Sequence, residues 1–371
     1  MAVSAIGIIF SNLHEENVPE LVRRRTMASV PYGGRYRIID FVLSNMVNSG
    51  ITTVGLMTSN NYRSLIDHIG SGKDWDLARK DGGLVLLPPF SENMEVYDNT
   101  RMEAISSLTG FLGRRNEKYV VLYDCDSVAK FDINAIIEFH ESKDADITIV
   151  TRKGLVEKTH DYLLVEADES GRIIDAKKVD RGETKGEATV SVGIMVFNRK
   201  FLLNLVNDSI AHGSRSFSKD VIMKQIDNLR IYSYDFKGYY AGIDSVATYF
   251  KHNMELLDKK VRDELFSGRD IYTKVRDSAP SKYGENAQVK NSLISDGCEI
   301  EGVVENSILF RGVRVGKGAV VRNSIVMQDS VVSDGASINC VITDKNVVIT
   351  SNRHLSGCEA LPYIIQKGKH L

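Results

Sequence analysis

The segment AIGIIFSNLHEENVPELVRRRTMASVPYGGRYRIIDFVLSNMVNSG, residues 5–50, decides the fold of the first part of the chain. An apolar strand, Ala5 to Phe10, leads through a loop to an apolar-periodic helix, Ile38 to Ser49. This order is typical of a nucleotide-binding βα unit, whose glycine-rich loop wraps phosphates with backbone N–H groups. Here the loop after Phe10 has no glycine and carries three glutamates, Glu15, Glu16 and Glu20. Bulky side chains prevent close backbone approach and carboxylates repel a polyphosphate, so this loop is not expected to hold one.

Strands and helices alternate as far as about Leu257. Short apolar runs predict buried parallel strands at Thr53 to Thr58, Tyr119 to Tyr123 and Asp146 to Thr151. Helices are expected at Ser64 to Ile69 and at Ile133 to Glu141, the second capped by Asp132. The alternation predicts an α/β domain over residues 1–257, with a Rossmann-like, mixed but mostly parallel sheet and ligands at the carboxyl ends of its strands.

The pattern changes in the last third of the chain. Residues 258–285 show little periodicity and are predicted to be a linker. From residue 286 to 371 an internal repeat appears, with Asn-Ser-Leu-Ile at Asn291, Asn-Ser-Ile-Leu at Asn306, Asn-Ser-Ile-Val at Asn323 and Asn-Cys-Val-Ile at Asn339. Small or β-branched residues recur about every six positions, which predicts a parallel β-helix. An antiparallel sandwich is the alternative, but it would not need this period.

Composition excludes several classes of protein. A chain of 371 residues with 43% hydrophobic and 26% charged residues is ordinary for a soluble protein of two domains. A net charge of -2 argues against nucleic acid as a partner. The four cysteines are widely spaced with no CxxC pair, which favours reduced thiols in a cytoplasmic protein. The N-terminus lacks a signal-peptide pattern and no apolar run approaches the ~18 residues that span a bilayer, so no membrane partner is expected.

Several motifs resemble the bacterial ADP-glucose pyrophosphorylases. They are PYGGRYRIIDFVLSNMVNSG at residues 31–50, HIGSGKDWDL at 68–77, GGLVLLPP at 82–89 and NMELL at 253–257. With the C-terminal repeat they cover nearly the whole chain. The resemblance implies an α/β nucleotidyltransferase domain followed by a left-handed β-helix, assembled as tetramers. It also implies the formation of ADP-glucose from ATP and glucose 1-phosphate with Mg²⁺.

The catalytic positions of that family differ in this chain. The family's loop LAGGxGxRL corresponds to residues 10–18, where its three glycines become Asn12, Leu13 and Glu15. Its phosphate-neutralising lysine becomes Met27. Its second metal-binding aspartate becomes Gly242. The resemblance therefore points to the subset of the family that accompanies a catalytic subunit and does not itself catalyse the reaction.

Some binding positions of the family are retained. Asp126 takes the position of a carboxylate that helps to hold Mg²⁺, and the alternative is that it only ends a strand or turn. Ser191, Gly193 and Tyr97 are expected to be vestigial substrate-binding residues, although a small residue and a glycine can be retained for the strand alone. The lysine that grips the sugar phosphate falls on Val179, or on Lys178 after a one-residue slip. Asp244, two positions after Gly242, would lie on the same face of a strand, about 6–7 Å along.

A basic cluster stands out in this acidic chain. Arg23, Arg24 and Arg25 are consecutive, and Arg35 and Arg37 follow the Pro-Tyr-Gly-Gly turn. One interpretation is a solvated charged face. The other is an anion site for a phosphorylated effector or for phosphate, which guanidinium groups bind well. The resemblance supports the second interpretation, because effectors of the family bind near this segment, between the two domains.

Three functions compete. The first is a regulatory, largely non-catalytic subunit of glycogen biosynthesis that modulates a homologous catalytic partner in a heterotetramer and needs no cofactor of its own. The second is an active glucose-1-phosphate adenylyltransferase, which would need Mg²⁺ at Asp126. The third, a hexapeptide-repeat acyltransferase, is disfavoured because the coils offer no clear catalytic histidine and the α/β domain has its own specific motifs.

Overall fold

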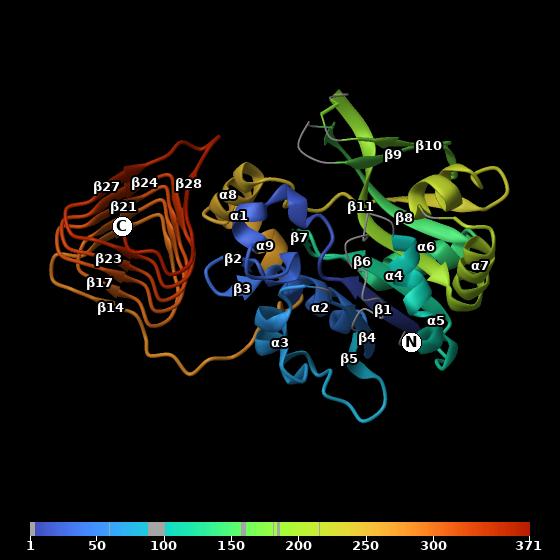
Figure 1. Ribbon diagram of the computed structural model, residues 1–371, viewed down its shortest axis with the longest axis horizontal. Coiled ribbons are helices and arrows are strands. Elements are labelled where there is room, and N and C mark those ends of the chain that lie inside the picture. The colour runs from blue at the N-terminus through green and yellow to red at the C-terminus, as the bar shows by residue number, and fades with distance from the viewer. Residues whose placement is uncertain are drawn as a thin grey trace.

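The computed structural model describes residues 4–58, 60–87, 101–156, 161–180, 182–183, 186–214 and 216–371. Two bodies lie side by side along the long axis of the molecule (Figure 1). One is an α/β domain formed by the first two thirds of the chain, and the other is a β-helix at the C-terminal end. In the described part of the chain, no helix is both long and apolar enough to cross a membrane.

A mixed sheet forms the centre of the α/β domain. Its strands are β1 (Ala5–Phe10), β4 (Thr53–Met57), β5 (Gly83–Leu87), β6 (Tyr119–Asp124), β8 (Ile147–Val156), β9 (Tyr162–Ala167), β10 (Ile173–Val179), β11 (Gly186–Asn198) and β12 (Ile231–Asp235). The order is β10-β9-β11-β6-β1-β4-β5, and β8 joins β11 to β12. The pairs among β6, β1, β4 and β5 are parallel, as is β8 with β12, whereas β11 is antiparallel to its neighbours. The predicted mixed, mostly parallel sheet is confirmed.

Helices cover both faces of this sheet. They are α1 (Pro19–Val22), α2 (Ile38–Asn48), α3 (Arg63–Ile69), α4 (Arg101–Ser107), α5 (Thr109–Gly113), α6 (Ile133–Ser142), α7 (Arg199–Ala211) and α8 (Val246–Glu255). Alternate residues of β1 and β6 point to opposite faces, so α2, α3, α6 and α8 share one hydrophobic cluster while α4, α5 and α7 share the other. Asp132 caps α6 as predicted, because its carboxylate accepts the Ala135 N–H at 3.3 Å.

Short elements connect these layers. The strands are β2 (Pro31–Tyr32), β3 (Tyr36–Arg37), β7 (Ser127–Ala129) and β13 (Tyr240–Gly242). The 3-10 turns are η1 (Glu15–Asn17), η2 (Met27–Ser29) and η3 (Lys73–Trp75), and η5 (Phe217–Met223) is a π-helical turn. The predicted linker, residues 258–285, begins with helix α9 (Lys259–Phe266) and ends in the first short strand of the β-helix. Leu265 of α9 is buried in the core of the α/β domain, which explains why this part of the segment is helical.

The C-terminal body is a left-handed parallel β-helix with three flat faces. Its faces are the sheets β14-β17-β20-β23-β26, β15-β18-β21-β24-β27 and β16-β19-β22-β25-β28. The strands are β14 (Lys282–Tyr283), β15 (Gln288–Lys290), β16 (Leu293–Ile294), β17 (Glu299–Ile300), β18 (Val303–Glu305), β19 (Ile308–Leu309), β20 (Arg314–Val315), β21 (Val320–Arg322), β22 (Ile325–Val326), β23 (Val331–Val332), β24 (Ser337–Asn339), β25 (Val341–Thr343), β26 (Val348–Ile349), β27 (His354–Ser356) and β28 (Tyr363–Ile365).

The Asn repeat has a structural explanation in the coils. Asn291, Asn306 and Asn323 all adopt positive φ angles, of 44°, 46° and 44°, at a corner between faces. Asparagine tolerates this left-handed backbone better than most residues. The Asn291 amide also donates to Asn306 Oδ1 at 2.8 Å on the next coil. The Asn-Ser pairs therefore turn three of the coils, Cys340 takes the same corner in the next coil with φ 52°, and apolar residues that follow these corners fill the interior.

The β-helix packs closely against the α/β domain. Ile308, Phe310 and Ile325 of the coils belong to the same buried cluster as the core of the α/β domain. Arg25, only 3% exposed, donates to Asp344 Oδ1 at 2.5 Å across this boundary. The two bodies thus share a hydrophobic core and a buried ion pair. These contacts fix the position of the β-helix relative to the α/β domain.

Candidate functional site

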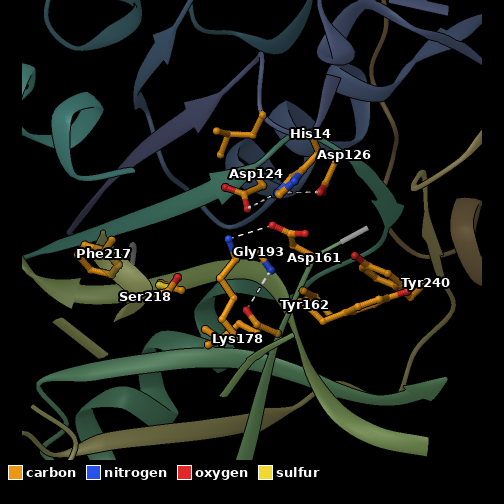
Figure 2. Close-up of a pocket in the computed structure, with 15 residues that line it drawn as sticks. His14, Asp124, Asp126, Asp161, Tyr162, Lys178, Gly193, Phe217, Ser218 and Tyr240 are labelled. Atoms are coloured by element: carbon orange, nitrogen blue, oxygen red, sulfur yellow. Dashed lines mark hydrogen bonds and ion pairs between the residues drawn. The ribbon is translucent and has the colours of Figure 1, made fainter. Parts of the chain in front are cut away.

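A polar cavity of about 110 Å³ lies at the carboxyl ends of β1 and β6 (Figure 2). Phe10 at the end of β1 is paired with Asp124 at the end of β6, so the segments that follow the two strands leave the sheet together. This is the place where parallel α/β sheets bind ligands. The remaining walls come from β9, β10, β11, η5 and β13, and the lining includes Leu13, His14, Asp124, Asp126, Asp161, Tyr162, Lys178, Ser191, Gly193, Phe217, Ser218 and Tyr240.

The loop after β1 satisfies its polar groups internally. Glu15 Oε1 accepts the backbone N–H of Met27 at 3.1 Å and the side-chain amide of Asn12 at 2.6 Å. Burial outweighs these hydrogen bonds and raises the pKa of the Glu15 carboxyl to about 7. The Glu15 side chain therefore accepts a hydrogen bond from a backbone N–H at this loop. In glycine-rich loops of this kind, such backbone N–H groups bind phosphate. The Met27 N–H is thus satisfied within the chain.

His14 reaches from this loop toward two carboxylates. Its Nε2 lies 3.8 Å from Asp124 Oδ2 and 3.7 Å from Asp126 Oδ2 (Figure 2). The residue adopts a left-handed backbone with φ 62°, which is uncommon for a non-glycine residue. Burial opposes charge on the imidazole, but Asp124 and Asp126 outweigh it and raise the pKa of His14 to about 9. At neutral pH an imidazolium therefore faces the carboxylates.

The predicted substrate-binding residues partly converge on this cavity. Asp126, Ser191 and Gly193 all line it. Gly193 has φ 78°, and a Cβ there would lie 2.7 Å from Asp124 Oδ2, so both its conformation and its space require glycine. Tyr97 lies outside the described residues. Asp244, expected on a strand beside Gly242, instead follows the end of β13, and its backbone N–H donates to Thr248 Oγ1 at 3.2 Å near the start of α8.

The two positions left open for the sugar-phosphate lysine, Lys178 and Val179, lie in different surroundings. Lys178 lines the cavity, whereas Val179 is buried in a small hydrophobic cluster. The Lys178 ammonium lies 2.9 Å from Asp161 Oδ2 and 3.7 Å from Asp180 Oδ1. A lysine is thus available at the mouth of the cavity, already paired with carboxylates.

The structure divides the predicted basic cluster into three parts. Arg25 is held in its buried ion pair with Asp344. Arg23 and Arg24 are exposed and line a cavity of about 140 Å³ beside Gln366, Lys367 and Lys369. Arg23 donates to Gln366 Oε1 at 2.8 Å. Arg35 and Arg37 line a different pocket at the boundary between the two bodies.

That boundary pocket gathers cations from four parts of the chain. Besides Arg35 and Arg37, its lining includes Arg276 of the inter-domain segment, and Arg311 and Lys345 of the β-helix. Arg311 is 8% exposed, and among the described residues its buried Nε and Nη2 have no hydrogen-bond partner. The Asp296 carboxylate lies 3.7 Å from the Arg311 Nε. A buried guanidinium with unfilled donors in a basic pocket is suited to a small polyvalent anion.

Lys345 has a strongly lowered pKa in this pocket. Burial, followed by the nearby guanidiniums of Arg37 and Arg25, lowers the pKa of Lys345 to about 7. Burial likewise lowers the pKa of Arg37 to about 10. A bound anion would reduce the repulsion among these cations, so its binding would be favoured electrostatically.

Sequence reasoning missed Arg276, Arg311 and Lys345. The repeat did contain a usable signal, because Arg311, Gln328 and Lys345 follow one another at intervals of 17 residues and all line the pocket. Paired strands such as β20 and β23 also differ by 17 residues, Arg314 opposite Val331. Residues 17 apart in this part of the β-helix therefore stack on consecutive coils. Arg276 had no such signal, since it lies in irregular backbone.

Comparison with known proteins agrees with this architecture. Residues 19–259 match the family described as Nucleotidyl transferase, and residues 278–358 match the one described as GlmU-like, C-terminal hexapeptide. The Glycogen biosynthesis protein GlgD of Bacillus subtilis is 32% identical over 364 residues, covering 98% of this chain and 96% of that protein. This chain belongs to the ADP-glucose pyrophosphorylase family. A Glucose-1-phosphate adenylyltransferase of Clostridium perfringens (strain SM101) is 33% identical over 385 residues, covering 95% and 97%. The enzyme of the same name from Geobacillus stearothermophilus is 34% identical over 328 residues, covering 87% and 84%.

Sequence identity does not distinguish the GlgD relative from the adenylyltransferase relatives, because all are 32–34% identical to this chain. The residues of the site provide a further comparison. Mg²⁺ prefers a near-octahedral shell of oxygen ligands. In this ADP-glucose pyrophosphorylase homologue Asp126 remains, but Gly242 offers no side-chain ligand and the imidazole of His14 lies 3.7 Å from Asp126. Asp124 and Asp126 could supply two carboxylates, but an imidazolium from His14 lies beside both of them, and the second aspartate position that the resemblance implies is Gly242. With that cation in place, the site does not fit the Mg²⁺ that adenylyl transfer in this family uses.

Proposed function

We propose that this chain is a regulatory, largely non-catalytic subunit of ADP-glucose pyrophosphorylase in glycogen biosynthesis. The observation that carries the proposal is the closed loop after β1. Glu15 uses the Met27 N–H, and His14 lies between Asp124 and Asp126, where adenylyl transfer would need phosphate and a metal. Nucleotidyl transfer depends on neutralising the charge that develops on the phosphate, and these groups do not supply it together.

The test is ADP-glucose formation by the purified chain with ATP, Mg²⁺ and glucose 1-phosphate. We expect no turnover above a sample lacking protein. A turnover in the ordinary enzyme range, ~1–10³ s⁻¹, would establish the second candidate, an active adenylyltransferase. That candidate is favoured by one observation, since Lys178, Ser191, Gly193 and Asp126 still share a single cavity.

The basic boundary pocket supports the regulatory part of the proposal. Arg35, Arg37, Arg276, Arg311 and Lys345 face it from both bodies, so an anion there would contact the α/β domain and the β-helix at once. An effector can bias a conformation only through contacts that differ between states. A pocket formed by two bodies provides such contacts whenever their packing changes. The proposed ligand is phosphate or a phosphorylated metabolite.

Calorimetric binding of inorganic phosphate tests this pocket. Arg311→Ala should lower the affinity at least about ten-fold, because a charge-assisted hydrogen bond in a buried site contributes roughly 1.5–3 kcal/mol. Arg314→Ala is the matched control, since Arg314 lies on the same coil with a side chain 64% exposed. A double variant, Arg23→Ala with Arg24→Ala, probes the neighbouring cavity. If that double variant loses binding while Arg311→Ala does not, the effector site is at Arg23 and Arg24.

The partner in this proposal is a homologous catalytic subunit, with a heterotetramer as the assembly. The β-helix supports it physically, because the face β16-β19-β22-β25-β28 packs against the α/β domain and its other two flat faces can pack against a second chain. Light scattering on the co-expressed pair should give one species heavier than either chain. Two separate species would exclude the mixed complex.

A further inference from the structure

A cluster of three donors at the end of the central strands has a composition unlike that of an Mg²⁺ site. His14, Asp124 and Asp126 each present one ligand atom, and these atoms lie within 4.8 Å of one another. The donor set is one imidazole nitrogen and two carboxylate oxygens (Figure 2). We propose that this cluster binds one first-row transition-metal dication of the zinc class in preference to Mg²⁺.

The fold brings these donors together from two adjacent strands. β1 and β6 are parallel neighbours in register, with Phe10 opposite Asp124. His14 comes from the loop after β1, Asp124 is the last residue of β6, and Asp126 follows two residues later. The two carboxylates lie on either side of the imidazole, as Figure 2 shows. The cluster therefore depends on sheet register and on the left-handed φ of His14.

The distances suit a small dication after a minor adjustment. Zinc binds histidine nitrogen and carboxylate oxygen at about 2.0–2.2 Å, so two ligands at a tetrahedral angle are about 3.4 Å apart. His14 Nε2 lies 3.8 Å from Asp124 Oδ2 and 3.7 Å from Asp126 Oδ2. The imidazole therefore needs to approach each carboxylate by a few tenths of an ångström, and the Asp126 side chain adjusts toward Asp124, since the three ligand atoms lie within 4.8 Å of one another. The side chains of His14 and Asp126 are 25% and 21% exposed, which leaves room for such movement.

The immovable part of the site is Asp124. Its side chain is 2% exposed. Gly193 approaches it so closely that a Cβ would lie 2.7 Å from Asp124 Oδ2. The loop that carries His14 is fixed by the hydrogen bonds of Asn12 and Glu15. One rigid ligand and two adaptable ligands form a partly preorganised site.

The chemistry of the donors selects the metal. Imidazole favours zinc, copper, iron and nickel, whereas Mg²⁺ requires an octahedral shell of oxygens. Metal binding would transfer the imidazole proton to solvent, as at every histidine ligand. Asp161, Lys178 and Ser191 line the same cavity, so water or a small anion there would complete the coordination of a bound ion. A zinc-class site is an addition to the proposed function. It rests on that function in one respect, because it assumes that the loop after β1 no longer binds the triphosphate for adenylyl transfer.

The experiment is titration of the whole protein with ZnCl₂ by calorimetry, with metal analysis after dialysis. Cys358 is exposed and could bind zinc by itself, so every sample carries Cys358→Ser. We expect one equivalent of zinc to bind in that background. His14→Gln should weaken binding at least about ten-fold, since loss of an outer-shell partner alone typically costs 10–100-fold. His212→Ala is the control, because His212 also pairs with an aspartate but is 74% exposed.

Each outcome of this titration has a definite meaning. Asp126→Asn provides a second variant, and circular dichroism verifies the fold of both. An absence of zinc binding, equal binding by His14→Gln, or displacement of zinc by equimolar MgCl₂ would each overturn the proposal. ADP-glucose formation is measured in the same samples. Turnover with Mg²⁺ would overturn the proposed function, whereas absent zinc binding without turnover would overturn only the metal site.

Discussion

Arg25 and Asp344 provide a test of how the two bodies are held together. Arg25 is 3% exposed and its guanidinium donates to Asp344 Oδ1 at 2.5 Å, while Asp344 is 7% exposed. Removing one partner of a buried ion pair typically costs 3–5 kcal/mol, because the other charge stays buried without compensation. The backbone N–H of Lys345 also donates to Asp344 Oδ1 at 2.7 Å and would stabilise the orphaned carboxylate. We therefore expect Arg25→Met to cost about 3 kcal/mol of unfolding free energy.

Urea unfolding can be followed by the fluorescence of Trp75, the single tryptophan of the chain, which is 1% exposed in the α/β domain. The double variant Arg25→Met with Asp344→Leu should recover most of the loss, since an apolar pair of similar size can replace a buried ion pair. Arg23→Ala is the control, because it removes only an exposed hydrogen bond to Gln366 and should cost within about 1 kcal/mol. If Arg25→Met costs no more than Arg23→Ala, the ion pair does not hold the boundary together and the reasoning fails.

Two further predictions follow from the boundary pocket and from the coils. Sulfate keeps its charge between pH 6.5 and 8.5, so a change in its affinity over this range reports on the protonation of the protein. As the pH rises through about 7, Lys345 loses its proton, and calorimetry should show the sulfate affinity falling by roughly three- to ten-fold. The groups that face Lys345 are Arg25, Arg37, Arg276 and Asp344, and burial lowers the pKa of His68 in the same pocket below its ordinary value. Lys345→Arg stays charged and should abolish the pH dependence, and a wild-type affinity that does not change with pH would contradict this explanation. At the coil corner, where Asn323 has φ 44°, Asn323→Ala should lower the unfolding free energy by about 1–2 kcal/mol, whereas Asn323→Gly should cost less; equal losses would show that backbone strain is not the reason for asparagine there.

Periodic features of this chain were predictable from the sequence, and contacts between distant residues were not. The strand Ala5–Phe10, helix α2 and the coils of the β-helix follow from local apolar periodicity and were predicted close to their observed bounds. The loss of the phosphate loop was also visible, because glycines are needed for backbone approach and none is present.

The arrangement of the two sites needed the fold. Nothing local indicates that Arg25 pairs with Asp344, 319 residues later, or that Arg276 joins Arg311 in one pocket. The approach of His14 to Asp124 depends on a left-handed φ at a non-glycine residue, which sequence patterns do not announce. Helix α9 was missed because the segment 258–285 has few apolar residues, and Leu265 is the residue of that helix buried in the core.

The central claim is that this chain regulates a catalytic partner and does not form ADP-glucose itself. The most direct measurement compares the initial rate of ADP-glucose formation by the purified chain, by a catalytic homologue, and by their co-purified complex, each titrated with phosphate. We predict no turnover for the chain alone and, for the complex, a rate and a phosphate response that differ from those of the homologue by the 5–150-fold typical of allosteric coupling, or about 1–3 kcal/mol. Turnover by the chain alone, or a complex whose curves superimpose on those of the homologue, would contradict the account.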